Sequence, residues 1–452
     1  MLHLKTAVSR IIAIVFVAVC LIAVSLSKPA GETSETSDGG VPTGSVIFLH
    51  PDGSGASMWQ ALRYIEYGPD SSSNWDRLDH MGLYRSHMLN STNASSHGGA
   101  TIHAYGIKVP FDTYGDAGKS PLTAASGKQM SIMHEAIRAG LPTALINSGH
   151  ICEPGTGVFV ASSPKRSWSD TISAQIIHSG VDIILSGGEK LLLPEGEVGR
   201  HGADGVRKDG RNLIQEARDL GYTVVFTRDE LLALPNDAGK VLGVFSASHT
   251  FNAAPEERLA KENLPHYNAG TPTVGEMTEV ALRLMKHRGE PFFMVVEEEG
   301  TDNFANSNNA AGTIEALRHA DRAIGVVTEY IAANPHTLLI MAADSDAGGF
   351  QMVSVRNEDE FNRPLPERAD NGAPLDGVDG PGSLPFVAKP DAAGTELRFA
   401  VAWSCYDDVA GSIIARAHGL NAELLGNNVD NTDIYRIMYA TLFGELLPAQ
   451  PR

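Results

Sequence analysis

The sequence predicts an α/β protein in which a central, mostly parallel β-sheet is covered by helices on both faces. Short apolar segments with the length of buried strands alternate with longer segments whose apolar residues recur at helical spacing. This alternation is typical of parallel sheets, because their crossover helices pack on both faces. The chain has 452 residues, 42% hydrophobic and 20% charged, which suits a large globular domain with insertions.

The predicted strands are short apolar runs that end in turn-forming residues. The first, Ser-Val-Ile-Phe-Leu-His, is broken by Pro51-Asp52-Gly53, and the later ones have the same character. We expect strands at 45–50, 141–147, 181–185, 222–226, 241–245, 291–296, 337–342 and 399–403. We expect helices at 209–220, 272–287, 314–332 and 433–443.

The acidic composition argues against one class of partner. The formal net charge is −19, and Lys and Arg form no block in the sequence. Because nucleic acid is bound through clustered basic side chains, we do not expect it as a partner. The excess acid is either solvated surface or a source of cation ligands.

The N-terminus has the pattern of a targeting segment. Lys5 and Arg10 flank the start of an apolar run from Ile11 to Leu26, which is typical of a signal peptide. This pattern predicts export to the periplasm or the extracellular space. The run is short for a membrane span of about 20 residues, but an uncleaved membrane anchor remains an alternative. We therefore assign 1–27 to a signal peptide or an N-terminal anchor.

The rest of the chain divides into a linker and one domain. Residues 28–43 are rich in Gly, Ser, Thr and Glu, which indicates a flexible linker. Residues 44–450 form the main domain, with an inserted loop region at about 356–393 that is rich in Pro, Gly and Asp. Cys152 and Cys405 lie after the targeting segment, either as a disulfide or as two buried thiols.

Two serines stand at the expected start of a helix between Asn93 and Lys108. Ser95 and Ser96 precede Gly98 and Gly99. Free N–H groups and the helix dipole favour an anion at such a helix start. A serine there either caps the helix or attacks a phosphoryl or acyl centre.

Acidic residues follow three of the predicted strands. Asp52 follows the first, Glu297–Glu299 and Asp302 follow the sixth, and Asp344 and Asp346 follow the seventh. The carboxyl ends of parallel strands lie along one edge of the sheet, so these side chains are expected to converge. Converging anions repel one another and need cations, which predicts a metal site.

These motifs, in their order and spacing, resemble the alkaline phosphatase family over about 44–447. The residues that carry the resemblance are Pro51-Asp52-Gly53, Ser96 before Gly-Gly-Ala-Thr, Tyr105-Gly106-Ile107-Lys108, Arg166, Asp182-Ile-Ile-Leu-Ser-Gly-Gly, Asp209-Gly-Arg-Asn-Leu, Glu276-Met-Thr, Glu297, Asp302 and Asp344. The resemblance implies a three-layer α/β/α sandwich, two catalytic metals with a third nearby, and a phosphoserine intermediate.

The resemblance also implies roles for single residues. Ser96 falls where the family has its nucleophile, and Arg166 where it has the arginine that grips two phosphate oxygens. Asp52 falls on a carboxylate shared between metals. Asp302 and Asp344 match ligands of the two catalytic metals.

A third, magnesium-type metal has its own expected ligands. The resemblance places Glu297 on one of them. Thr156 falls near another, and Glu153 competes with Thr156 for that role.

The sequence departs from the family where histidines are expected. Asn306 stands four positions after Asp302, and Ser345 follows Asp344, both where the family has histidine. The third family histidine should fall near 391–392, and none is there. Ser95 also replaces the acid that usually precedes the nucleophile.

The remaining candidate ligands, Asn306 included, are nearly all oxygen. Oxygen ligands suit calcium, magnesium or manganese better than zinc, although the family implies magnesium and zinc. We expect two to three divalent ions. Replacement ligands would come from the Asp-rich loop 370–380, unless that loop is only a turn. His97 is a weak candidate ligand, and His103 is expected on the helix surface.

The resulting hypothesis is an exported, metal-dependent phosphate monoester hydrolase that acts through a phosphoserine intermediate. Its partners would be small-molecule phosphate esters. The resemblance implies a homodimer. The protein would associate with a membrane only if the N-terminal segment is uncleaved. The alternatives are a phosphodiesterase or another superfamily hydrolase, or a non-catalytic metal- or phosphate-binding protein.

Overall fold

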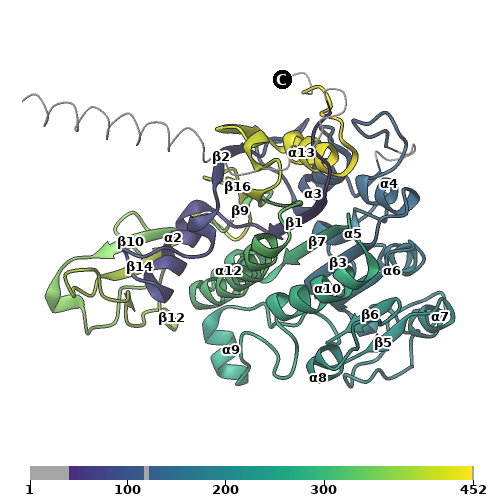
Figure 1. Cartoon of the computed structure of the whole chain (residues 1–452). Helices are drawn as coiled ribbons and strands as arrows, with labels where there is room; N and C mark the ends of the chain where they lie inside the picture. Colours follow the sequence, from purple (N-terminus) through teal and green to yellow (C-terminus); the bar gives the residue numbers. More distant parts are fainter. Residues whose placement is uncertain (1–39, 117–121, 450–452) are drawn as a thin grey trace, which may run out of the picture. The chain divides into compact units, whose positions relative to one another are not determined.

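Ten strands form the central sheet of the computed structural model, which describes residues 40–116 and 122–449 (Figure 1). In order across the sheet they are β17 (Asn428–Asp430), β2 (His80–Arg85), β16 (Ile414–Gly419), β8 (Thr337–Met341), β1 (Ser45–Pro51), β7 (Phe293–Glu298), β3 (Thr143–His150), β4 (Ile183–Gly187), β6 (Val241–Val244) and β5 (Thr223–Val225). Only β16 runs antiparallel to its neighbours among these strands. The mostly parallel sheet is therefore confirmed.

The predicted strands from 45–50 to 337–342 all lie in this sheet, with their ends shifted by a few residues. β2, β16 and β17 were not expected. The predicted targeting segment at 1–27, and the linker at 28–43 apart from its last four residues, lie outside the described residues. Across the described ranges, no helix is long and apolar enough to cross a membrane.

The predicted strand 399–403 belongs to a different sheet. It is β14 (Arg398–Ala402), which pairs antiparallel with three other strands. The members of this small sheet are β10 (Gln351–Val355), β11 (Leu375–Gly377), β12 (Gly380–Pro381), β13 (Phe386–Val387) and β14. Phe399 and Val401 are buried, which gives β14 the apolar pattern of a central strand. The inserted region 356–393 is therefore partly strand rather than a plain loop.

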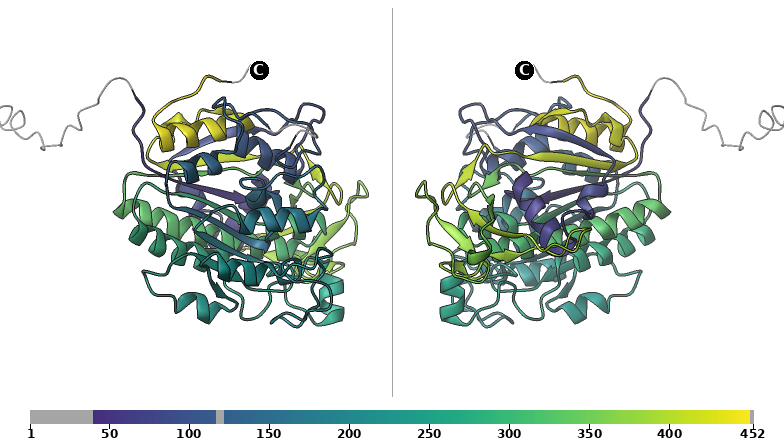
Figure 2. Two further views of the ribbon diagram at one scale, coloured as in Figure 1. Left: turned by 90° about the vertical axis from the view of Figure 1, so that its right-hand side faces the viewer. Right: turned by 90° about the vertical axis from the view of Figure 1, so that its left-hand side faces the viewer.

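Helices cover both faces of the central sheet (Figures 1 and 2). They are α2 (Ala56–Glu66), α3 (Ser96–Tyr105), α4 (Ile132–Arg138), α5 (Pro154–Gly157), α6 (Ser169–Ile177), α7 (Leu213–Asp219), α8 (Arg228–Leu232), α9 (Glu256–Glu262), α10 (Val274–Arg288), α11 (Gly300–Asn306), α12 (Ala310–Ala333) and α13 (Asn431–Phe443). Short 3₁₀ turns lie at Trp75–Arg77, Glu189–Leu191, Glu358–Glu360 and Ala422–Leu424.

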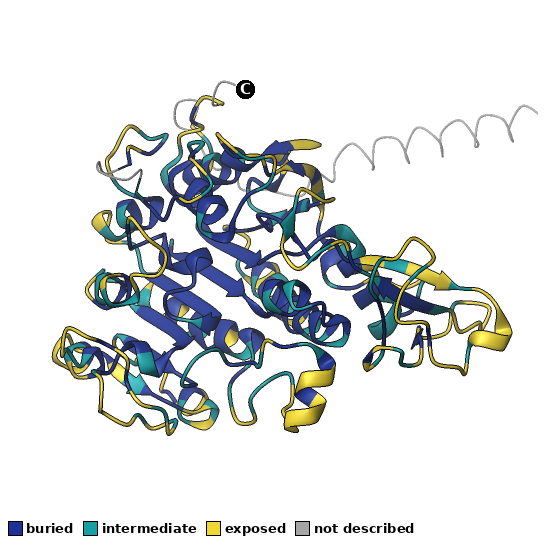
Figure 3. Ribbon diagram, turned by 180° about the vertical axis from the view of Figure 1, so that it is seen from behind, coloured by how far each residue is buried: buried dark blue, intermediate teal, exposed yellow. Residues whose placement is uncertain are grey.

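Alternate residues of β1 face two separate apolar layers. Val46 and Phe48 pack with residues of α3, α4, α6, α7 and α13. Ile47 and Leu49 pack with residues of α2, α10 and α12. All four side chains are buried, and the central strands of the sheet lie in the buried interior (Figure 3). This arrangement is the predicted three-layer α/β/α sandwich.

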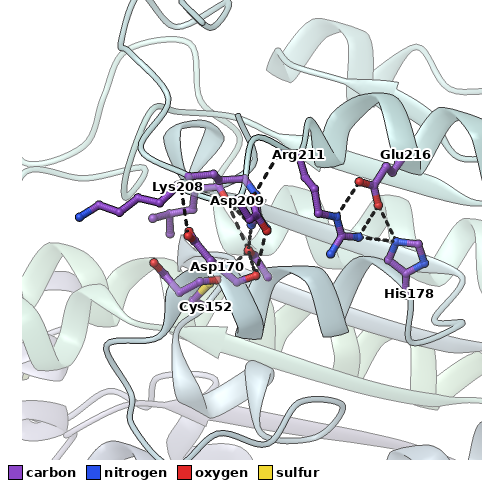
Figure 4. A network of polar contacts seen from close by, with 11 residues as sticks. Cys152, Asp170, His178, Lys208, Asp209, Arg211 and Glu216 are labelled. Carbon is purple, nitrogen blue, oxygen red and sulfur yellow. Dashed lines mark hydrogen bonds and ion pairs between the residues drawn. The ribbon is translucent and has the colours of Figure 1, made fainter. Parts of the chain in front are cut away.

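A polar network fixes the start of α7, away from the strand ends (Figure 4). The fully buried Arg207 donates to Ser173 Oγ at 2.6 Å and pairs with Asp209. The predicted helix 209–220 begins only at Leu213, because the Asn212 side chain caps it.

Candidate metal centre

The predicted helix start at the paired serines is present. Ser95 is the N-cap of α3, and its hydroxyl accepts a hydrogen bond from Gly98 N at 3.2 Å. Ser96 is the first helical residue and is 5% exposed. Because Ser95 provides the cap, the hydroxyl of Ser96 is not needed for capping. The N–H groups of this first turn favour a bound anion.

Gly99 brings the start of α3 against the end of β8. A Cβ atom on Gly99 would lie 2.4 Å from Cβ of Asp344, so only glycine permits this approach. Ser96 precedes Gly99 by three residues and therefore lies on the same face of the helix. The candidate nucleophile thus lies beside the carboxylates at the sheet edge.

Buried carboxylates from three strands converge at this edge. Atoms of Asp52, Glu297 and Glu299 lie within 4.8 Å of one another, and so do atoms of Asp52, Asp344 and His50. All five side chains are at most 1% exposed. This convergence of the strand-end acids, Glu299 included, was expected from the sequence, but the presence of His50 among them was not.

Asp302 joins the same group of carboxylates. It lies in the first turn of α11, and a Cβ atom on Gly53 would be 2.7 Å from its Oδ1 atom. Gly53 follows Asp52 directly and has a φ of 63°, which favours glycine. The turn after β1 therefore lies against Asp302.

The chemistry of these donors fits divalent cations. The following atoms form no hydrogen bond with any described residue: His50 Nε2, both Oδ atoms of Asp52 and of Asp344, Glu297 Oε1 and Glu299 Oε2. Buried polar atoms are normally paired, so such a cluster of unpaired oxygens needs a ligand. Burial and the charge of Asp52 raise the pKa of Glu297 to about 8, and the same causes raise that of Asp344 well above its usual range. A bound cation would remove this penalty.

Asp408 and Asp302 form a second group of carboxylates, which the Asn306 amide links. The Asn306 amide donates to Asp302 Oδ1 at 2.9 Å and to Asp408 Oδ1 at 3.2 Å. Burial and neighbouring carboxylates, first Asp408, raise the pKa of Asp302 well above its usual range. Asp408 belongs to β15 (Asp408–Val409), which pairs with β9 (Asp346–Ala347) and so reaches the site.

The loop 370–380, which the sequence left open as a source of replacement ligands or as a turn, contributes to none of the metal-type clusters in the part of the chain that the structure describes. Asp391 accepts hydrogen bonds from the backbone N–H groups of Ala393 and Thr395, so the region near 391–392 is a surface turn. In the loop 370–380, Asp376 accepts from Trp403 Nε1 at 2.6 Å and belongs to none of the clusters among the described residues. The adjacent acids Asp407 and Asp408 are the sequence signal that could have drawn attention to this segment.

Arg166 and Glu153 form an ion pair near the centre. Arg166 donates to Glu153 Oε2 at 2.8 Å. The Nε2 atoms of His150 and His249 lie 3.0 and 2.9 Å from the other carboxylate oxygen. Burial alone would raise the pKa of Glu153, but the two imidazoles and the guanidinium hold it well below its usual range.

Thr156 is linked to the centre through an amide. Asn147 donates to Thr156 Oγ1 at 2.9 Å and also donates to Glu297. Thr156 lies in α5, whose Gly155 faces Glu297 so closely that no side chain would fit there. The structure therefore places Thr156 near Glu297, while Glu153 is occupied by Arg166 and two imidazoles.

The expectation that His103 lies on the helix surface is wrong, and the alternative left open for the two cysteines is decided for free thiols. His103 is fully buried, and its Nε2 atom lies 2.6 Å from the Tyr84 hydroxyl, so it is not on the helix surface. Cys152 and Cys405 are both free, and Cys405 is only half-buried. His97 lies 3.9 Å from Asp112 and is part of no metal-type cluster in the described chain.

Comparisons with known proteins agree with this geometry. A model of the alkaline phosphatase family matches residues 44–374. A membrane-bound alkaline phosphatase of Bombyx mori is 24% identical over 80% of this chain and 72% of its own length. Streptomycin-6-phosphate phosphatase of Streptomyces griseus is 28% identical over 71% of this chain and 77% of its own length.

Solved structures show the same fold. Thermus thermophilus alkaline phosphatase has a TM-score of 0.67 at 22% identity and covers 92% of this chain and 95% of its own. The alkaline phosphatase from the Antarctic bacterium TAB5 has a TM-score of 0.66 at 17% identity, with 90% and 99% covered. The matched family model, the sheet and the buried carboxylates together lead to one conclusion: this chain belongs to the alkaline phosphatase family.

Proposed function

We propose that the protein is a metal-dependent hydrolase of phosphate monoesters that uses Ser96 as its nucleophile. The observation that carries this proposal is the position of Ser96, one turn from the contact between Gly99 and Asp344. A hydroxyl at a helix N-terminus, beside buried carboxylates that need cations, suits an attack on an anionic phosphoryl group.

The metal ligands divide into three groups. Asp52 and Asp344 would hold one ion, and Asp302 and Asp408 would hold a second, with the Asn306 amide donating to both carboxylates. Asp52, Glu297 and Glu299, with Thr156 nearby, would hold a third. When bound, the ions supply Lewis-acid stabilisation of the charge on the phosphoryl oxygens. Because the donors are nearly all oxygen, magnesium, calcium or manganese fit better than zinc.

The residues of the chain perform two displacements at phosphorus. Ser96 Oγ loses its proton to solvent and forms a bond to phosphorus while the bond to the ester oxygen breaks, and the departing alkoxide takes a proton from water and leaves as the alcohol. Water then attacks the phosphoserine, which releases phosphate and restores the hydroxyl. Arg166 donates to two nonbridging oxygens of the phosphoryl group.

The partners follow from the same chemistry. Small-molecule phosphate esters are the proposed substrates, and the matched Streptomyces griseus relative is by name a phosphatase of such a compound. We propose an exported enzyme on the basis of the N-terminal pattern, with a homodimer as the assembly that the family implies.

The decisive test is phosphate release from p-nitrophenyl phosphate at alkaline pH. The protein is stripped with a chelator and reloaded separately with magnesium, calcium, manganese and zinc. We expect turnover with one of the first three ions and little with zinc. Activity only on bis-p-nitrophenyl phosphate would favour the diesterase alternative. Binding of phosphate without turnover under every ion would favour the non-catalytic alternative.

A further inference from the structure

His50 is a fully buried imidazole at the centre of the site, and the proposed function gives it no role. It is the sixth residue of β1 and directly precedes Pro51 and Asp52. β1 pairs with β8, whose end carries Asp344. The imidazole is therefore held between two carboxylates that come from adjacent strands.

One ring nitrogen of His50 is fixed by the backbone. Its Nδ1 atom lies 2.7 Å from the carbonyl oxygen of Ala342. Because a carbonyl oxygen only accepts hydrogen bonds, Nδ1 must carry the proton. In the neutral imidazole, the lone pair then lies on Nε2. Histidines that bind a metal usually donate their other ring N–H to a partner such as a backbone carbonyl, and His50 has this arrangement.

The other ring nitrogen faces the carboxylates. His50 Nε2 lies 3.4 Å from Asp52 Oδ1 and forms no hydrogen bond with any residue in 40–116 or 122–449. Ligand atoms of His50, Asp52 and Asp344 lie within 4.8 Å of one another. These distances leave room for one ion between the three donors. The carboxylate oxygens of both acids are equally unpaired.

We propose that His50 Nε2 coordinates the divalent ion held by Asp52 and Asp344. This inference rests on the metal dependence in the proposed function. It identifies His50 Nε2 as the one nitrogen ligand of the ion that Asp52 and Asp344 would hold. Ser345, which follows Asp344, has no imidazole. His50 supplies an imidazole next to Asp344 from the neighbouring strand β1. The set of one imidazole and two carboxylates suits manganese and still permits zinc.

The test uses electron spin-echo spectroscopy on the full chain loaded with Mn²⁺. We expect a ¹⁴N coupling of directly bound imidazole in the wild-type protein, and its loss in His50→Gln. We also expect the affinity for one Mn²⁺ ion, measured by calorimetry, to fall at least about tenfold in that variant. His103→Gln is the matched control, because its ring lies 5.5 Å from that of His50 but is bonded to Tyr84.

Each result decides the proposal. A wild-type protein that binds Mn²⁺ and releases phosphate, but shows no ¹⁴N coupling, would overturn this inference and leave the proposed function intact. Unchanged coupling in His50→Gln would assign the nitrogen to another histidine and would also overturn it. A wild-type protein that binds no divalent ion would overturn both proposals together. The wild-type spectrum needs no variant, so it remains decisive if His50→Gln fails to fold.

Discussion

Arg166 is held by Glu153 through a hydrogen bond of 2.8 Å from its guanidinium to Oε2. Ser95 stands where the resemblance expects an acid, and its hydroxyl is used to cap α3 instead. Glu153 is thus a carboxylate that orients the arginine from another element. The carboxylate is itself held by the imidazoles of His150 and His249 at its second oxygen.

This relationship predicts coupled effects of two substitutions. Glu153→Gln should raise KM for a phosphate ester about tenfold with a smaller change in kcat, because Arg166 loses its orienting charge. Arg166→Ala should raise KM by a larger factor than Glu153→Gln. The double variant should be no worse than Arg166→Ala alone, as expected for residues that act as a unit. Additive losses in steady-state kinetics would show that Glu153 acts independently of Arg166.

The two adjacent serines should respond differently to substitution. Ser96→Ala should lower phosphate release at least about a thousandfold, because the attacking oxygen is removed. Ser95→Ala should keep turnover but lower the free energy of unfolding by about 1 kcal/mol, because α3 loses its cap. Steady-state assays and denaturant unfolding measure the two effects. Full turnover in Ser96→Ala would contradict a phosphoserine mechanism.

Metal-free protein should lose stability as the pH rises. Burial and the charge of Asp52 raise the pKa of Glu297 from 4.5 to about 8. The folded state therefore holds this proton more tightly than the unfolded chain. The resulting stabilisation is complete below pH 4.5 and is lost as the pH passes through about 8. In the presence of a chelator, the midpoint temperature of thermal unfolding should decrease as the pH is raised from about 5 to about 9. Saturating Mg²⁺ should abolish this decrease.

The control for this prediction is Glu297→Gln, which cannot ionise. Its midpoint in chelator should depend less on pH than that of the wild-type protein. A metal-free wild-type protein whose midpoint is constant or rises over this pH range would show that the buried carboxylates are compensated without cations.

The sequence predicted the sheet and the clustered acids because both depend on short-range patterns. Each predicted strand of the central sheet is a local apolar run, and parallel strands necessarily bring residues such as Asp52 and Asp344 to one edge. Among the three missed strands, β17 has only three residues, β2 exposes Met81 and Leu83 to 59% and 51%, and β16 alternates alanine with Arg416 and His418. Their apolar residues therefore do not follow the pattern of a buried strand.

The candidate ligands that the sequence did not reveal, His50 and Asp408, depend on long-range geometry. His50 lies in an apolar run and has the sequence context of any core residue; only the pairing of β1 with β8 places it next to Asp344. Asp408 reaches the site through the two-residue pairing of β15 with β9. The family's third histidine was expected near 391–392, a surface turn that β14 separates from Asp408.

The oxygen-rich ligand set should be convertible to a nitrogen-rich one. The Asn306 amide donates to the carboxylates of both Asp302 and Asp408. The double variant Asn306→His with Asp408→His would therefore place two imidazoles at one ion. Because zinc prefers nitrogen ligands, the ratio of zinc to magnesium affinity should rise at least about tenfold. Competition dialysis with elemental analysis measures this ratio. Asp391→His is the matched control, since Asp391 lies in a surface turn, and it should leave the ratio unchanged. A larger shift in the control than in the double variant would mean that the third ligand comes from the turn at Asp391 and not from Asp408.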